Sequence, residues 1–341
     1  MPENHHALNP PFVEKARIRP ADEKNIVSAA ELLSAGKLVA FPTETVYGLG
    51  ADAANSDAVA RVYDVKQRPV DHPLIVHVAD QSDMAFWARD IPEQAWRLVR
   101  RFTPGPLTLI LPRANHVRDA VTGGQDTIGL RIPSHPVAQR LLTAFAERGG
   151  RGVAAPSANR FGHVSPTSAQ HVADDFGEKV DLILDGGAAI YGIESTVIAF
   201  VDRPLLLRPG SLSLASIEEE LGETLAFPAG QPAPRASGTL ASHYAPDTPT
   251  VLVSSREFEE KLAAFSAQGM RVATLAHTMI SSSRHALRLP ATPAEYAHHL
   301  YAALRTLDAA GADLILIENV PDSASWLAVR DRLTRATTPA P

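Results

Sequence analysis

The stretch Lys37-Leu-Val-Ala-Phe-Pro-Thr-Glu-Thr-Val-Tyr-Gly-Leu-Gly-Ala-Asp52 decides the fold, because an apolar run passes directly into hydroxyls, a carboxylate and glycines. Its first part, Lys37–Phe41, predicts a short buried strand. Residues 22–35 before it carry apolar side chains at helical spacing, and Gly36 follows where a helix commonly ends. A strand that leaves its sheet through a polar loop is typical of α/β proteins, which bind ligands at strand ends.

Similar short apolar runs recur through the first two thirds of the chain. They predict strands at Leu74–Val78, Leu107–Leu111, Thr127–Ile132, Val153–Ala155, Leu182–Leu184 and Ser195–Phe200. Helical patterns lie between several of them, at Asp57–Lys66, Glu93–Phe102 and Val137–Ala146. Because Pro and Gly interrupt the pattern often, we expect a twisted open sheet with mixed strand directions and helices.

A change of composition marks a second domain. From Gly222 to Pro249 the chain is rich in Pro, Ala, Gly and Ser, which predicts an extended linker. Beyond it, predicted strands and helices alternate, at Thr250–Ser254, Glu257–Ala267, Arg271–Leu275, Pro293–Ala310, Asp313–Glu318 and Ala324–Arg335. We therefore predict an α/β protein with a catalytic domain at 15–215, a linker at 216–249, and a smaller Rossmann-like βαβ domain at 250–337.

The bulk composition excludes several kinds of chemistry. A chain of 341 residues with 45% hydrophobic content is large enough for two globular domains. The chain contains no cysteine, which rules out thiolate nucleophiles, zinc-thiolate sites and iron-sulfur clusters. Neither a signal-like start nor a run of about 18 apolar residues is present, so we expect a cytoplasmic protein without membrane contact. The net charge of −6 lacks the basic surplus of a typical nucleic-acid binder.

Hydroxyls follow the first predicted strand. Thr43 and Thr45 can bond a small polar substrate, and Gly48 and Gly50 permit close backbone approach. The alternative is a threonine-rich turn with no ligand. Both interpretations stay open for this cluster alone.

Two cations stand at the end of a predicted helix. Lys66 and Arg68 would suit a triphosphate, because a compact ammonium and a planar guanidinium together neutralise phosphoryl oxygens. The alternative is ordinary capping of a helix C-terminus. His72 and His77 lie nearby, but without carboxylates or thiolates at ligand spacing we expect no metal bound by protein residues.

Two arginines sit at or near the ends of apolar runs. Arg131 and Arg208 would each be costly to bury without an anion. The partner of Arg131 is either an internal carboxylate or the carboxylate of a ligand such as an amino acid, and the residues alone do not choose between them.

A loop at residues 154–167 offers neutral donors, which form a natural cradle for phosphates. Ser157, Asn159 and Ser165 supply them. The spacing of the P-loop is missing, so an ATP site here is of another kind. Neither Ser157 nor Ser195 has the Gly-x-Ser-x-Gly elbow, which disfavours a serine hydrolase.

Taken in order, these clusters resemble the threonylcarbamoyl-AMP synthase family, the YrdC-like fold, in its long two-domain form. The resemblance runs from about Arg17 to Gly210, continues through Ser242-His-Tyr-Ala-Pro246, and includes the C-terminal domain. The paired family signature, Lys-x-Arg with Ser-x-Asn, is present as Lys66/Arg68 and Ser157/Asn159. Ala236–Ser242, ahead of the His-Tyr pair, is a variant of the family's linker motif.

The resemblance implies a set of roles, in which Lys66 and Arg68 are catalytic. L-threonine would be held by Thr45, His77, Arg131, Ala155 and Ser195. ATP would be held by Lys66, Arg68, His72, Thr127, Ser157, Asn159, Ser165, Arg208 and Tyr244. Because Tyr244 lies in the linker, the resemblance also implies that the linker is an active-site lid.

The implied reaction joins L-threonine, bicarbonate or CO2, and ATP, with Mg2+ accompanying the triphosphate but no dedicated protein site for it. The product would pass to a tRNA threonylcarbamoyl transferase complex, and direct tRNA binding stays open. Two rivals are a carbamoyl-transfer enzyme of the same fold and an RNA-binding module without catalysis. The lack of cysteine disfavours the first, which usually carries zinc-finger-like segments, and the charge balance disfavours the second.

Overall fold

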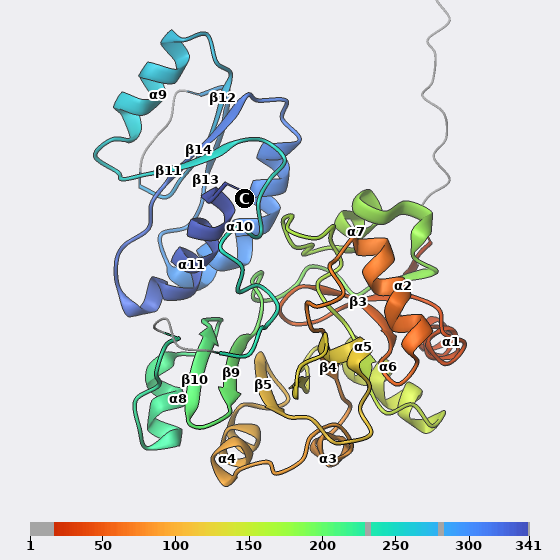
Figure 1. Cartoon of the computed structure of the whole chain (residues 1–341). Coiled ribbons are helices and arrows are strands. Elements are labelled where there is room, and N and C mark those ends of the chain that lie inside the picture. Colours follow the sequence, from red (N-terminus) through yellow and green to blue (C-terminus); the bar gives the residue numbers. More distant parts are fainter. Residues whose placement is uncertain (1–16, 229–232, 279–282, 340–341) are drawn as a thin grey trace, which may run out of the picture.

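The computed structural model describes residues 17–228, 233–278 and 283–339, and within them the chain forms two separate sheets (Figure 1). In spatial order, the strands of the larger sheet are β1 (Ile18–Pro20), β8 (Leu182–Asp185), β2 (Val39–Pro42), β3 (Tyr47–Asp52), β7 (Val153–Ala154), β4 (Ile75–His77), β6 (Thr127–Arg131), β5 (Leu107–Pro112), β9 (Thr196–Phe200) and β10 (Pro204–Arg208). Strands β4 and β6 are parallel, whereas β5 and β6 are antiparallel, so the predicted mixed sheet is confirmed.

The stretch Lys37–Asp52 is a hairpin rather than a strand followed by a loop. Strands β2 and β3 pair antiparallel, with Val39 opposite Gly50. The prediction of a loop over the second half was wrong, because the glycines serve packing. A Cβ atom on Gly50 would lie 2.8 Å from both the Phe41 ring and the Val153 side chain. The hairpin leaves the turn at residues 43–46 as the polar segment.

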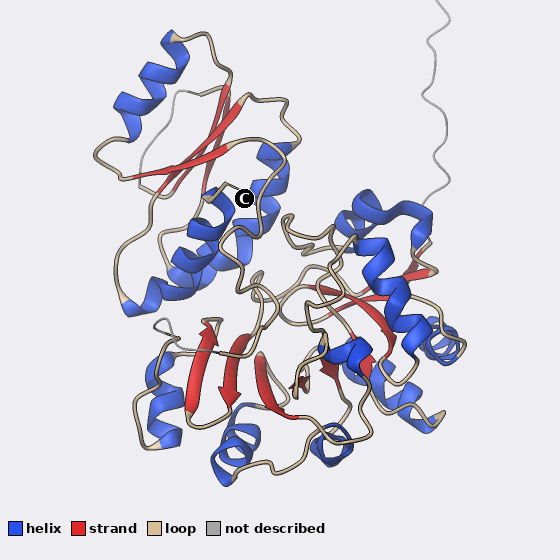
Figure 2. Ribbon diagram, in the orientation of Figure 1, coloured by secondary structure: helices blue, strands red, loops and turns tan. Residues whose placement is uncertain are grey.

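Helices cover both faces of the larger sheet (Figure 2). On one face, α1 (Glu23–Ser34) and α6 (Pro136–Glu147) pack over Val39 and Phe41. The alternate residues Leu38 and Ala40 belong to the core of the opposite face, as the period of a strand requires. The helices of that face are α2 (Ser56–Lys66), α3 (Met84–Trp87), α4 (Glu93–Phe102), α5 (Asp119–Thr122), α7 (Ala169–Phe176) and α8 (Leu214–Leu221).

The smaller sheet is parallel throughout its described strands, which are β11 (Thr250–Val253), β14 (Leu314–Glu318), β12 (Val272–Ala276) and β13 (His285–Arg288) in spatial order. Helices α10 (Pro293–Asp308) and α11 (Leu327–Thr337) pack on one face and α9 (Phe258–Ala267) on the other. In Figure 1, α10 and α11 lie between this sheet and the larger domain. The sequence analysis missed β13, because this edge strand is only partly buried.

The linker runs between the two domains (Figure 1). Its described residues, 222–228 and 233–249, carry no helix or strand. The expected boundary at 215/216 falls inside α8, whose Ile217 and Leu221 pack into the core of the larger domain. The extended chain therefore starts after α8.

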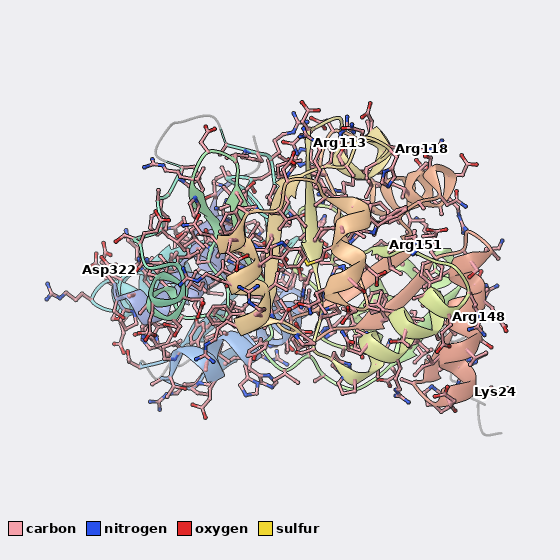
Figure 3. The ribbon with its side chains drawn as sticks, turned by 90° about the horizontal axis from the view of Figure 1, so that it is seen from below. Lys24, Arg113, Arg118, Arg148, Arg151 and Asp322 are labelled. Atoms are coloured by element: carbon pink, nitrogen blue, oxygen red, sulfur yellow. The ribbon has the colours of Figure 1, made fainter. Side chains whose placement is uncertain are left out.

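In Figure 3 the labelled basic side chains all lie toward the larger-domain end of the molecule, and they are Lys24, Arg113, Arg118, Arg148 and Arg151. Asp322 lies at the opposite end. Among the described residues, no helix is both long and apolar enough to cross a membrane.

We predict that Leu141→Ala destabilises the larger domain by about 2–5 kcal/mol, because the side chain is fully buried between α6 and α1 and its removal leaves a cavity. Chemical denaturation followed by circular dichroism measures the change. Val70→Ala is the matched control, since Val70 is 72% exposed and its truncation should leave the denaturation midpoint in place. Equal effects of both substitutions would contradict this account of the core.

Candidate active site

A small cavity of about 40 Å3 lies where the β2–β3 turn, the strand ends and the linker meet. We call it the central cavity. Sequence-predicted site residues that line it are Thr45, Arg68, His77, Arg131, Ala155, Ser157, Ser195, Arg208 and Tyr244. Residues from widely separated stretches of the chain are therefore brought together as expected. The space suits a few water molecules and is far too small for ATP.

The turn between β2 and β3 forms one wall. The Thr43 hydroxyl lies 2.8 Å from the Thr45 hydroxyl and donates to the Val46 carbonyl at 2.6 Å. Backbone N–H groups of Thr45 and Val46 point back at the Thr43 oxygen. The turn is thus closed by its own hydroxyl, and Thr45 is fully buried facing the cavity.

Arg131, at the end of β6, has an internal partner. Its guanidinium donates to Glu44 at 2.6 Å, and the other oxygen of Glu44 accepts from the backbone N–H of Ser134 and His135. Among the described residues, the Arg131 Nε atom has no hydrogen-bond partner, although it is buried. Of the two interpretations left open for Arg131, the structure shows the internal carboxylate, Glu44, and leaves one buried guanidinium donor without a described partner.

His77, at the end of β4, is a neutral imidazole. Burial, and next the positive charge of Arg131, lower its pKa to about 3. Its Nδ1 atom is buried and finds no partner among the residues the structure describes. The ring packs edge-on against Phe41 at 6.3 Å between centroids. His77 can therefore offer a neutral hydrogen bond to a ligand in the cavity.

Lys66, the last residue of α2, points into the body of the protein rather than into solvent. Its Nζ atom donates to the Ser157 carbonyl at 2.6 Å and to the Asn159 carbonyl. Burial, and next the charge of Arg68, lower the pKa of Lys66 well below its ordinary range. The Lys-x-Arg and Ser-x-Asn motifs thus meet through main-chain oxygens, about 90 residues apart in sequence.

Arg68 and Arg208 face each other across the cavity and hold the linker between them. Arg68 donates to the Pro73 carbonyl at 2.8 Å and to the Ser237 hydroxyl at 3.1 Å. Arg208 donates to the Ser237 carbonyl at 2.7 Å and to the Ser195 carbonyl at 3.0 Å. Burial lowers the pKa of Arg68 to about 10, so it keeps its charge at neutral pH.

None of these three cations forms a salt bridge with a described residue, although the charge of Glu194 acts on Arg208 from farther away. In the part of the chain that the structure describes, no carboxylate comes within 4 Å of Lys66, Arg68 or Arg208, and neutral oxygens satisfy them instead. Buried charge without an opposite charge is costly, because neutral dipoles recover only part of the lost hydration. The arrangement can accept an anion, above all one with several phosphoryl oxygens.

Ser195 stands just before β9 and is fully buried. Its hydroxyl lies 2.7 Å from the Thr108 hydroxyl and accepts from Arg208 at 3.1 Å. In the cavity lining, Ser195 lies between Thr45 and Arg131 on one side and the guanidinium groups of Arg68 and Arg208 on the other. A ligand between these walls would meet hydroxyls on one side and guanidinium groups on the other.

Five predicted residues lie behind the cavity lining or beside it. Asn159 donates to the carbonyls of Arg160 and His163, and its Oδ1 atom is buried without a partner among the described residues. The Ser165 hydroxyl donates to Glu194 at 2.6 Å. The remaining three are Lys66, which lies under the loop of Ser157, His72, whose ring packs on Phe161, and Thr127, which lines a smaller hollow beside Ser237.

The linker closes the cavity from above. Gly238 has φ of 77°, and a Cβ atom there would lie 1.9 Å from the Tyr244 hydroxyl and 2.8 Å from Arg208. Tyr244 is almost completely buried with φ of 63°, and its hydroxyl has no partner among the described residues. His243 beside it is also buried, and burial lowers its pKa to about 3. Tyr244, which was expected to belong to a lid, lines the central cavity.

Several cavity residues escaped the sequence analysis. Glu44 and Glu194 were not singled out as partners, although each directly precedes a predicted substrate residue. Ser237 and Gly238 were treated as part of a generic linker, although a Ser-Gly-Thr run inside a proline-rich segment offered a signal. Glu44 meets Arg131 over 87 residues of sequence and Ser237 meets Arg68 over 169, and no local pattern reveals such contacts.

The fold and the cavity define a protein that binds an anionic small molecule at the strand ends of a twisted mixed sheet. Residues 31–210 match the family model described as Telomere recombination, and residues 212–338 match the one described as Threonylcarbamoyl-AMP synthase, C-terminal domain. The chain belongs to the threonylcarbamoyl-AMP synthase family.

Individual relatives agree with this placement. The threonylcarbamoyl-AMP synthase of Pyrococcus abyssi is 42% identical, covering 93% of this chain and 95% of its own length. A crystal structure of Pyrococcus abyssi Sua5 complexed with L-threonine superimposes with a TM-score of 0.87 at 42% identity, covering 94% of this chain and 96% of that one. A shorter relative, the putative synthase of Mycobacterium tuberculosis, is 36% identical over 58% of this chain and 90% of its own length.

We predict that Gly238→Ala opens the linker, because the added methyl would overlap the Tyr244 hydroxyl and strain a positive φ. Limited proteolysis should cut residues 222–249 several-fold faster in this variant. Gly222→Ala is the matched control, since Gly222 has a similar φ of 74° but no atom within 4 Å of the added methyl. Unchanged cleavage in Gly238→Ala would contradict the closed position of the linker.

We predict that the free energy of unfolding decreases as the pH drops from 6.5 toward 3. His77 and His243 have folded-state pKa values of about 3, against 6.5 for a free imidazole, so the unfolded chain binds more protons in this window. The stability is fully present above pH 6.5, and each group contributes a loss of about 1.4 kcal/mol per pH unit below it. Urea denaturation at several pH values measures the slope.

His77→Gln should reduce that slope by the share of one histidine, because glutamine does not titrate. The exposed His116 provides the control, and His116→Gln should retain the full slope. An equal reduction in both variants would contradict the assignment to the buried ring.

Proposed function

We propose that this chain is an L-threonylcarbamoyladenylate synthase, a nucleotidyltransferase that forms threonylcarbamoyl-AMP and pyrophosphate from L-threonine, bicarbonate or CO2, and ATP. The product would serve threonylcarbamoyladenosine modification of tRNA next to the anticodon. The observation that carries the proposal is the set of three cations, Lys66, Arg68 and Arg208, buried beside one cavity with neutral oxygens as their only described partners. A triphosphate supplies the missing charge.

L-threonine would occupy the wall formed by the β2–β3 turn. The unpaired Nε of Arg131 suits the amino-acid carboxylate, because Glu44 already holds the guanidinium in a fixed orientation. Neutral His77 and the hydroxyls of Thr45 and Ser195 are close enough to the same cavity to bond the amine and the side-chain hydroxyl. Ala155 lines the cavity with a small apolar side chain and leaves room for the substrate methyl group.

The reaction runs in two stages. The amine of threonine attacks the carbon of CO2 and releases a proton, or attacks the carbon of bicarbonate with loss of water, and either route gives a carbamate. A carbamate oxygen then attacks the α-phosphorus of ATP, and the bond from that phosphorus to the bridging oxygen breaks to release pyrophosphate. Lys66, Arg68 and Arg208 would neutralise the phosphoryl oxygens, which is the main help that protein groups give to such transfers.

The linker would act as a lid. In the closed form, oxygens of Ser237 bond Arg68 and Arg208, the two guanidinium groups that phosphates would need. ATP must therefore displace Ser237, and the linker can close again over the nucleotide with Tyr244 on top. Closure would exclude water, which matters because a carbamate is labile.

Mg2+ would enter with the triphosphate. Glu194, the carboxylate that lines the central cavity, is already bonded through both oxygens. The described residues hold no group of three or more potential ligands placed for a metal ion. The donor set thus fits a cation held by phosphate oxygens and water, whose usual contribution is charge neutralisation.

The downstream partner is a proposal of the same kind. A threonylcarbamoyl-AMP is a reactive mixed anhydride, so an enzyme that transfers the acyl group to tRNA must receive it soon after release. We expect this exchange in the cytoplasm, and direct contact of this chain with tRNA stays open.

We predict that pyrophosphate release from ATP, Mg2+ and radiolabelled bicarbonate depends on L-threonine. Lys66→Ala and Arg68→Ala should each lower the rate at least about 100-fold, because each would remove a charge close to the proposed triphosphate site. Lys37→Ala is the control, since Lys37 is exposed and lies outside the central cavity.

Release that ignores threonine, or that survives both substitutions, would contradict the synthase assignment. Turnover with carbamoyl phosphate instead would support the carbamoyl-transfer rival. RNA retention on a filter with a steep salt slope and no ATP turnover would support the RNA-binding rival.

A further inference from the structure

Glu194 connects the active site to the C-terminal domain. It directly precedes Ser195, and its buried carboxylate accepts from the Ser165 hydroxyl at 2.6 Å. Its other oxygen accepts from Arg332 Nε at 2.8 Å and from the Tyr301 hydroxyl at 3.0 Å. Burial alone would raise the pKa of Glu194, but Arg332 and then Arg208 outweigh it and hold the pKa at about 2. The carboxylate is therefore ionised and fixed.

Arg332 belongs to α11 of the smaller domain, yet it is fully buried against the larger one. Besides Glu194 it bonds Asp331 at 2.7 Å. Its guanidinium carbon also lies 5.2 Å from the centroid of the Tyr244 ring, in a cation–π contact. One side chain thus touches both the loop that carries Ser195 and the linker residue that closes the cavity.

Tyr301, from α10, makes the same double contact. Its hydroxyl donates to Glu194, and its ring stacks on Tyr244 with 5.7 Å between centroids. Around these polar contacts the interface is apolar, since Val46, Val164 and Ile193 pack in one core with residues of α10. Each of these three follows or precedes a residue of the site. The smaller domain therefore forms the back of the active-site walls.

A purely stabilising role does not account for this pair. Burying an ion pair removes both charges from water, and well-packed apolar side chains of similar size often stabilise a protein as well or better. Unlike apolar packing, an ionic network fixes the relative orientation of its side chains, because its hydrogen bonds form in one geometry only. Here that geometry sets the positions of Ser195 and Tyr244 relative to each other.

We propose that Arg332 and Tyr301 are positioning residues of the active site, through which the C-terminal domain holds Glu194 and Tyr244 in the arrangement that binds L-threonine under the closed linker. The part of the inference that concerns threonine rests on the proposed function. Shorter relatives span little beyond the larger domain, so the chemistry has no general need of a second domain. In this chain, however, the walls are completed by it.

Arg332→Met tests the proposal, because it keeps the bulk of the side chain and removes the charge. We expect the KM for L-threonine to rise on the order of 10-fold, since a loosened wall misplaces the substrate. Partial unfolding would instead lower kcat and leave KM in place. Glu194→Gln should raise the KM in the same way, and the double variant should be no worse than Arg332→Met alone, because both changes interrupt one contact.

Tyr301→Phe provides a milder variant in case Arg332→Met folds poorly. It removes one hydroxyl and retains the ring stack, so the expected rise in KM is about threefold at an unchanged melting temperature. Arg330→Met is the matched control, because Arg330 lies on the same helix but pairs with the exposed Asp322 and should leave KM unchanged.

The rate of proteolysis within residues 222–249 gives a readout that needs no turnover. We expect it to rise several-fold in Arg332→Met and to stay unchanged in Arg330→Met. An unaltered KM and an unaltered cleavage rate in both Arg332→Met and Tyr301→Phe would overturn the inference, as would multiplicative effects in the double variant. A wild-type enzyme without threonine-dependent turnover would overturn the proposed function instead, and the cleavage rates would still decide the positioning of the linker.

Discussion

The structure depends on keeping positive charge inside the protein without a salt bridge to balance it. Lys66, Arg68 and Arg208 are each buried, and main-chain carbonyls and hydroxyls are their described partners. Each such burial costs several kcal/mol in hydration, of which neutral dipoles return only a part. The three cations lie close together around the central cavity, and the lowered pKa values of Lys66 and Arg68 reflect their lost hydration. An incoming polyanion would remove it, so binding energy and electrostatic relief coincide.

The mixed sheet provides the carbonyls that this constraint requires. In an open sheet of mixed direction, strand ends and connecting loops converge from several segments, so unpaired main-chain oxygens can face one point. The loop after β7 supplies the oxygens of Ser157 and Asn159 for Lys66, and the segment before β9 supplies that of Ser195 for Arg208. Arg131 differs, because it forms a direct ion pair with Glu44.

Local patterns predicted those parts of the fold and the site that local physics controls. The helix that ends in Lys66 and the strand that ends in Arg131 follow from periodicity, and the cation spacing of Lys66 and Arg68 is visible in the sequence. Strand β3 was missed, because the glycines that signal a loop instead leave room for the Phe41 ring of the neighbouring strand. Glu44, Glu194 and Ser237 acquire their roles from partners some 87 to 169 residues away, and a single sequence without comparison holds no record of such pairs.

In the proposed lid, the neutrality of the linker contact would allow the linker to open again. Ser237 meets Arg68 and Arg208 with a hydroxyl and a carbonyl, which bond a guanidinium more weakly than a phosphate does. A carboxylate at this position would compete with ATP, and an apolar side chain would remove the hydroxyl that bonds Arg68. Smallness matters equally, because Gly238 lets the chain pass between Tyr244 and Arg208. The linker would therefore fill the proposed anion site well enough to close it and weakly enough to leave.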